Sequence, residues 1–161
     1  MTTQINNTPE AIHTALTATL SYAIVAQDLG KKDKNREATY TLTNDERGTH
    51  ITFRVRRPKG FKTMLVDVMT GSCNESDYEY VGSMNRGLFI KPAATMSEAA
   101  AAKLRGLRWY MVGTSKAVKG QRDMLNGVSL HHDGNCACCG RKLTNPESLA
   151  TGIGPVCEGR L

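Results

Sequence analysis

The sequence predicts an α+β fold, in which a helix packs on an antiparallel sheet of four to five strands and a small cysteine-rich unit follows. Three observations lead to this prediction. Apolar residues recur at helical spacing in two stretches, they alternate with polar residues through the middle of the chain, and four of the five cysteines lie between Cys136 and Cys157. We expect an N-terminal helix and basic linker at residues 1–35, a sheet domain at 36–130 and the cysteine-rich unit at 131–161.

The first helix is predicted to begin at residues 8–10, Thr-Pro-Glu. Threonine caps helix N-termini, proline fits the first turn, and an acidic side chain interacts favourably with the positive end of the helix dipole. Ile12, Leu16 and Leu20 continue the helical spacing, and we expect one helix that ends near Gly30. The charged run KKDKNRE that follows is typical of a solvated linker.

Alternation of apolar and polar residues then predicts strands. The segment TYTLTNDERGTHITFRVRR holds two alternating runs around NDERG, which is the pattern of a β-hairpin. Its apolar side chains, such as Tyr40 and Phe53, should face the core, whereas Arg54 and Arg56 should face water. KTMLVDVMT and DYEYVGSM predict two further strands, and LFIKP predicts a short fifth strand.

A second helix is predicted from about residue 97 to 112, with a serine as its N-cap and an apolar stripe toward the sheet. Arg105, Arg108 and Trp109 fall away from that stripe. Arg105 and Trp109 are four residues apart, so the guanidinium can lie over the indole ring. Residues 113–130 contain glycines and lysines and are expected to be irregular.

The composition excludes several classes of protein. No stretch reaches the roughly eighteen apolar residues that a membrane-spanning helix needs. The N-terminal segment has neither the basic start nor the apolar run of a secretory signal. An odd number of cysteines argues against a disulfide scaffold. We therefore expect a cytoplasmic protein with no membrane partner.

The charge distribution indicates a polyanionic partner. The net charge is +6, and residues 31–130 carry eighteen basic and ten acidic residues, whereas residues 131–161 carry three of each. A basic middle region beside a neutral cysteine-rich end is typical of proteins that bind nucleic acid.

The cysteines have the spacing of a metal site. Cys136 and Cys139 are separated by two residues and are followed by Gly140, as in a zinc knuckle, and Cys157 supplies a third thiolate. Between them, Asn-Pro-Glu at residues 145–147 predicts a short helix that ends at Gly152 and returns the chain to the metal.

A structural zinc ion takes four ligands, so one place remains. We favour His132, which lies four residues before the first cysteine of the pair, and keep Cys138 and His131 as alternatives. Cys138 adjoins Cys139 and would have to turn back into the same coordination sphere. No acid or base stands beside these residues in a recognisable motif, so a structural Zn²⁺ is expected rather than a catalytic one. The prediction is thus an α+β fold with a C-terminal zinc finger.

The residues of this finger resemble those of a known family. The motif His132-x3-Cys136-x2-Cys139-Gly140-Arg141-x-Leu143-Thr144, followed by Gly152-Ile153-Gly154-Pro155-x-Cys157, is similar to the C-terminal finger of an uncharacterised family in bacteriophages and actinobacteria. The likeness extends upstream to cover roughly residues 36–161. It implies a viral protein in a phage or prophage setting, acting in the cytoplasm of a host cell. It supports a zinc site of three cysteines and one histidine, but it carries no known activity.

Two functions follow as hypotheses. The first is nucleic-acid binding with weak sequence preference through a basic sheet and helix surface, whose predicted contacts are Arg54, Arg56, Arg57, Lys59, Lys62, Arg105 and Arg108. The alternative is a protein-interaction factor that inhibits or redirects a host protein complex, with the N-terminal helix as its docking element. The oligomeric state is not predicted.

An enzyme is the less favoured class. The sequence has no Ser-His-Asp set, no phosphate-binding glycine loop and no carboxylate pair in a recognisable frame. The scattered acids Asp67, Glu75, Asp77 and Glu79 leave a metal-dependent nuclease as a minor alternative.

Overall fold

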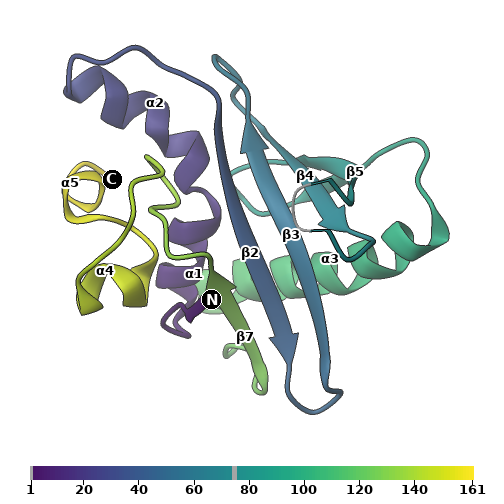
Figure 1. The fold of residues 1–161 in the computed structure, drawn as a ribbon. Helices are drawn as coiled ribbons and strands as arrows, with labels where there is room; N and C mark the ends of the chain where they lie inside the picture. Colours follow the sequence, from purple (N-terminus) through teal and green to yellow (C-terminus); the bar gives the residue numbers. More distant parts are fainter. Residues whose placement is uncertain (1, 74–75) are drawn as a thin grey trace.

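The computed structural model describes residues 2–73 and 76–161, and Figure 1 shows its fold. Within these ranges, seven strands form one antiparallel sheet in the order β1-β7-β2-β3-β4-β5-β6. The strands are β1 (Thr3–Gln4), β2 (Arg36–Asn44), β3 (Thr49–Arg57), β4 (Met64–Met69), β5 (Tyr78–Met84), β6 (Ile90–Pro92) and β7 (Val128–His132). The helices are α1 (Pro9–Leu16), α2 (Ala18–Asp28), α3 (Glu98–Val118), α4 (Pro146–Thr151) and α5 (Pro155–Glu158).

The α+β class and the antiparallel sheet are confirmed, but the predicted count of four to five strands is wrong. The five predicted strands correspond to β2 through β6, and the sequence prediction missed β1 and β7. β1 has only two residues, and β7 lies in a stretch that was expected to be irregular. β7 pairs with β2 along its whole length, for example Leu130 with Leu42. These pairings stabilise a strand that five residues of local sequence do not specify.

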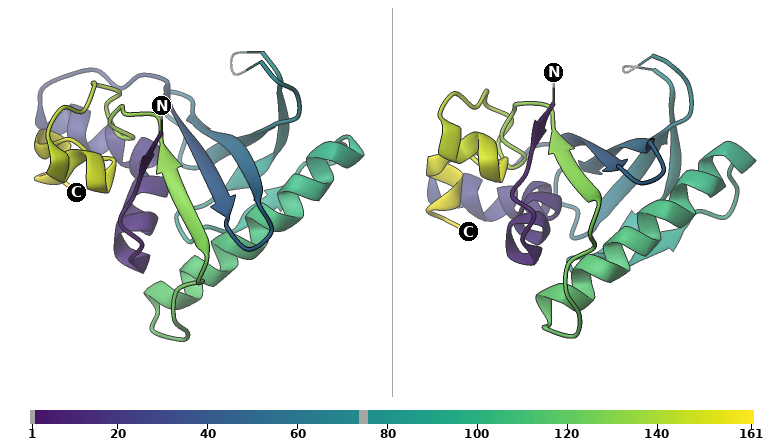
Figure 2. Two further views of the ribbon diagram at one scale, coloured as in Figure 1. Left: turned by 60° about the horizontal axis from the view of Figure 1, so that its bottom comes forward. Right: turned by 90° about the horizontal axis from the view of Figure 1, so that it is seen from below.

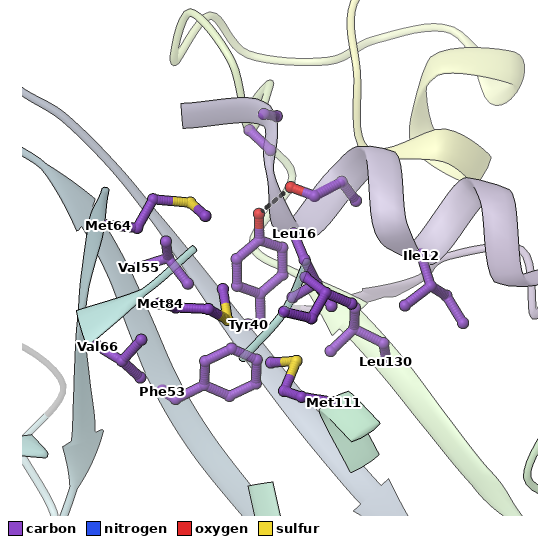
Figure 3. Close-up of a cluster of buried hydrophobic side chains, with 14 of the residues drawn as sticks. Ile12, Leu16, Tyr40, Phe53, Val55, Met64, Val66, Met84, Met111 and Leu130 are labelled. Carbon is purple, nitrogen blue, oxygen red and sulfur yellow. Dashed lines mark hydrogen bonds between the residues drawn. The ribbon is translucent and has the colours of Figure 1, made fainter. Parts of the chain in front are cut away.

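The core lies between one face of the sheet and the helices α1, α2 and α3. Tyr40 and Phe53 pair across β2 and β3, and their rings stack with centroids 5.3 Å apart (Figure 3). The hydroxyl of Tyr40 donates to the carbonyl oxygen of Ala15 at 2.5 Å, where α1 approaches the sheet. The hairpin predicted from the alternation of residues therefore forms, and its apolar face is the centre of the core.

The helices differ from the predicted ones at their ends. Thr8 caps α1 as expected, accepting from the backbone N–H of Ala11 at 3.2 Å. The single predicted helix is instead two, because the backbone leaves helical geometry at Thr17. α3 continues to Val118, six residues beyond the predicted end. Gly113 lets the extended helix pack closely against Leu125, since a Cβ at this position would lie 3.0 Å from a methyl carbon of that side chain.

The cysteine-rich unit shares its core with the rest of the molecule. Buried residues from Ile5 to Cys157 form one continuous cluster, and the backbone N–H of Asn6 donates to Ala150 of α4 at 2.8 Å. Figure 2 shows α4 and α5 beside the N-terminal helices. The predicted boundary between residues 130 and 131 lies inside β7. No helix in the described ranges is long and apolar enough to cross a membrane.

Candidate metal centre and basic surfaces

Three thiols converge in the C-terminal unit. The sulfur atoms of Cys136, Cys139 and Cys157 all lie within 4.8 Å of one another, although they come from two segments that are far apart in sequence. Sulfur atoms that bind one tetrahedral zinc ion lie about 3.8 Å apart, given a Zn–S distance of about 2.3 Å. The arrangement therefore fits a metal ion after small side-chain adjustments.

The backbone around Cys136 is shaped to bring these thiols together. Asn135 and Lys142 form a bridge, and the N–H of Gly140 donates to the carbonyl of Cys136 at 2.8 Å, which closes a tight turn. Gly140 has φ 83°, a conformation that glycine adopts without strain. The guanidinium of Arg36 packs against Gly140 and donates to the carbonyl of Cys138 at 2.9 Å, which ties β2 to this turn.

The return of the chain to Cys157 follows the predicted signals. Asn145 caps α4 by accepting from the N–H of Ser148 at 2.8 Å, and Gly152 ends α4 in the left-handed conformation, φ 74°. The N–H of Gly154 then donates to the sulfur of Cys136 at 3.3 Å. This bond places the start of α5, and with it Cys157, beside Cys136.

The electrostatics of the cysteine cluster favour the binding of a cation. Burial, together with the neighbouring Cys136, raises the pKa of Cys157 well above its ordinary value. Burial opposes ionisation of Cys139 too, but hydrogen bonds from the backbone of Arg141 and from the neighbouring thiols lower its pKa. A bound dication would supply the positive charge that several thiolates in one small volume need.

His132 does not join the three thiols. The ring is buried, and both of its nitrogens have backbone partners: Nε2 lies 2.7 Å from the carbonyl oxygen of Leu149, and Nδ1 accepts from the N–H of Gly134 at 2.9 Å. The contact with Leu149 links β7 to α4. His132 is therefore satisfied as a structural residue in this arrangement. His131 pairs with Thr41 on the far face of the sheet.

Cys138 lies closer to the cluster than the sequence prediction assumed. Its side chain is completely buried, and its thiol hydrogen-bonds with that of Cys157. Burial raises the pKa of Cys138 to about 12. Cys136, Cys138, Cys139 and Cys157 form no disulfide. A fourth thiol thus lies near the three clustered ones, although it is not part of the group whose sulfur atoms all lie within 4.8 Å of one another.

The predicted sheet arginines are engaged within the protein. Arg54 and Arg56 both bind the carboxylate of Asp67, at 3.0 and 2.5 Å, and Arg54 also lies over the ring of Tyr78 at 4.3 Å. The Asp67 side chain is only 3% exposed, and its single negative charge offsets part of the positive charge of the two arginines.

Arg57 is buried and carries no surface charge. Its side chain is 1% exposed and forms an ion pair with Asp33. It also donates to the carbonyl of Thr19 at 2.8 Å, which anchors α2 to the end of β3. This burial removes Arg57 from the candidate contact surface.

The remaining predicted contacts, Lys59, Lys62, Arg105 and Arg108, are exposed. Trp109 is 51% exposed next to the two arginines on α3. The expected stacking of Arg105 on Trp109 does not occur, since the cation–π contacts of the described residues are at Tyr22 and Tyr78. Part of the indole therefore remains exposed to solvent.

Trp109 lines a hollow of about 370 Å³ between α3 and the β2–β3 hairpin, called here the α3 hollow. Arg105 lines it from the helix, and Arg47 and His50 line it from the hairpin. The sequence prediction missed these two hairpin residues. Arg47 lies within the turn NDERG and His50 follows it, but no local pattern shows that this turn lies beside a helix more than fifty residues away.

The scattered acids do not form a second metal site. Asp67 binds two arginines, Asp77 accepts from the N–H of Cys73 at 2.7 Å, and Glu79 accepts from Ser97 at the start of α3. Glu75 lies outside the described residues. Within the described ranges, the three cysteines form the only group of potential metal ligands.

Comparison with known proteins supports the C-terminal part of the resemblance. Residues 131–161 match a family of unknown function (DUF6011), and the match includes all three clustered cysteines. No curated protein and no solved structure gives a significant match to the chain.

Proposed function

We propose that the protein binds nucleic acid with weak sequence preference through the α3 hollow, and that a structural zinc ion holds its C-terminal unit. One observation carries the proposal: the half-exposed Trp109 stands beside Arg105 over a hollow that Arg47 and His50 also line. An exposed indole offers a face on which any base can stack, and arginines beside it can bind the phosphates.

This surface supports the function better than the sheet does. Arg105 and Arg108 form no ion pair within the described residues, so a phosphate does not have to displace a carboxylate. Contacts to stacked bases and phosphates carry little sequence information, which accounts for a weak preference. Single strands are the expected targets, because only their bases are free to stack.

Fluorescence anisotropy with labelled single- and double-stranded oligonucleotides tests the proposal. Affinity for the single strand should fall steeply with salt, because bound phosphates release counterions. R105E/R108E should abolish binding, whereas K59E/K62E, which changes the charge equally in a different turn, should weaken it far less. Equal losses in the two variants would show that net charge rather than the α3 hollow governs binding.

Zinc is proposed for the metal centre because its donor set is rich in thiolates and buried. The ion would cross-link the turn at Cys136 and Cys139 to α5 at Cys157. Because α4 and β7 share the main core, loss of the metal should lower the melting temperature of the whole protein and not merely unfold residues 131–161. C157S protein should contain no stoichiometric zinc in elemental analysis; retention of zinc would exclude the site.

A further inference from the structure

A groove of about 610 Å³ runs between α2 and the metal centre, and the proposed binding of nucleic acid does not use it. It is called here the α2 groove. Its apolar lining comes from two directions: Tyr22, Val25 and Leu29 lie on or next to α2, and Leu143 and Val156 belong to the C-terminal unit. Leu29 is 36% exposed and Val156 is 47% exposed, so both present apolar surface to a ligand.

The rim of the groove is entirely basic. Lys31 and Lys34 line one side and Arg141 and Lys142 line the other, whereas no aspartate or glutamate lines it. All four side chains are exposed, and none forms an ion pair within the described residues. Lys34 makes only a long cation–π contact, 5.7 Å from the ring centre of Tyr22. Four unpaired cations around an apolar floor are complementary to a ligand with several carboxylates and apolar side chains.

We propose that the α2 groove binds a short acidic segment of a partner protein, with an apolar side chain seated between Leu29 and Val156 and carboxylates on the rim. Nucleic acid fits the floor poorly, because the one aromatic ring there, Tyr22, is 5% exposed and has no free face for a base. The other large apolar side chains that line the groove, Val25, Leu29, Leu143 and Val156, are aliphatic. The inference is independent of nucleic-acid binding at the α3 hollow.

The metal centre forms one wall of this groove. Cys136, Cys139 and Cys157 all line it, and Val156 directly precedes Cys157. Removing the metal should therefore loosen the apolar wall as well as the C-terminal unit. Peptide binding should depend on bound zinc even though the peptide need not touch the metal.

The test uses the full zinc-loaded chain and three synthetic peptides. The first combines Asp and Glu with two Leu, the second has Lys in place of the acids, and the third has Ser in place of Leu. Amide NMR spectra and fluorescence anisotropy should show binding of the first peptide, with shifts at Leu29, Lys31 and Val156. The other two should bind at least tenfold more weakly. Failure of the acidic peptide to bind, or equal binding of all three, would overturn the proposal.

Paired charge reversals locate the site. K31E/K34E should weaken binding of the acidic peptide at least tenfold, whereas K116E/K119E, the same change of charge at the C-terminal end of α3, should leave its affinity within about twofold. An equal effect of both pairs would mean nonspecific attraction and would contradict the proposal. An oligonucleotide that displaces the peptide and shifts the same amides would instead assign the groove to nucleic acid. Neither outcome alters the test of the α3 hollow, which rests on R105E/R108E.

Discussion

The open face of the sheet and the outer face of α3 both carry the arginines of a basic protein, but the structure treats them differently. Arg54 and Arg56 share the carboxylate of Asp67, whereas Arg105 and Arg108 on α3 have no acidic partner among the described residues. The sequence shows the same residue type in both places. The contrast teaches that a basic segment marks a binding surface only where its charges are left unpaired after folding.

The largest effect, a loss of stability, is expected on replacing Arg57, because this arginine is buried and paired. R57A removes the partner of Asp33 and the donor to the carbonyl of Thr19, so it should destabilise the protein by about 3–5 kcal/mol. R108A should change stability by less than about 0.5 kcal/mol, because this side chain is exposed. The free energies of unfolding of the two variants can be compared by urea unfolding, monitored by circular dichroism. Similar values for both would mean that Arg57 is solvated.

Replacing Asp67 removes the difference between the two surfaces, because it takes away the acidic partner of the sheet arginines. D67N keeps the shape of the side chain but frees the charges of Arg54 and Arg56. We expect a loss of about 1–3 kcal/mol in stability, since a buried charge-assisted contact is weakened, and tighter binding of oligonucleotides through the sheet. Anisotropy measures the binding. Unchanged affinity would show that the sheet face is closed to nucleic acid even when its charges are free.

Replacing Trp109 tests the contribution of the α3 surface to binding. W109A should weaken single-strand binding by about 1–3 kcal/mol, roughly five- to 150-fold, by removing one stacking platform. Its effect on stability should be small because half of the side chain is exposed. The matched variant is Y80A on β5, since Tyr80 is 43% exposed but lies on the sheet. A larger loss of affinity in Y80A would move the binding surface to the sheet.

The smallest effect concerns pH. The hydrogen bond from the Arg57 guanidinium holds the pKa of Asp33 below its usual range, although burial acts against it. A carboxyl group with a lowered pKa stabilises the fold above its unfolded pKa of about 3.9, and this contribution is lost as the pH falls through the folded value. D33N should therefore lose less stability than the wild type between pH 5 and pH 3. Parallel slopes in urea unfolding would contradict this assignment.

Local signals in the sequence predicted the elements that local physics determines. The hairpin of β2 and β3, the caps at Thr8 and Asn145, and the convergence of three cysteines all follow from short patterns. β1, β7 and the long end of α3 did not, because each is held by partners distant in the chain. The same limit explains why parts of the candidate sites could not be predicted. Residue spacing shows neither the pairing of Asp67 with two arginines nor the hydrogen bonds of His132 to the backbone.

The fourth metal ligand shows the limit of prediction from residue spacing. Spacing favoured His132, but the structure gives both of its ring nitrogens to the backbone and leaves Cys138 beside Cys157. Cobalt substitution distinguishes four sulfur ligands from three sulfurs and one nitrogen by the absorption spectrum. A spectrum that changes in C138S but not in H132A would assign Cys138.

The position of β7 has a consequence for the order in which the chain folds. β2 pairs with β7 on one side, and β1 pairs only with β7, so the first strand of the chain waits for residues 128–132 before it can join the sheet. Until then the nascent chain leaves one edge of β2 uncovered, which is a known hazard for aggregation. Cys136 and Cys139 follow soon after β7, but Cys157 comes only near the end of the chain. The edge of β2 can therefore be covered before all three clustered cysteines have been synthesised.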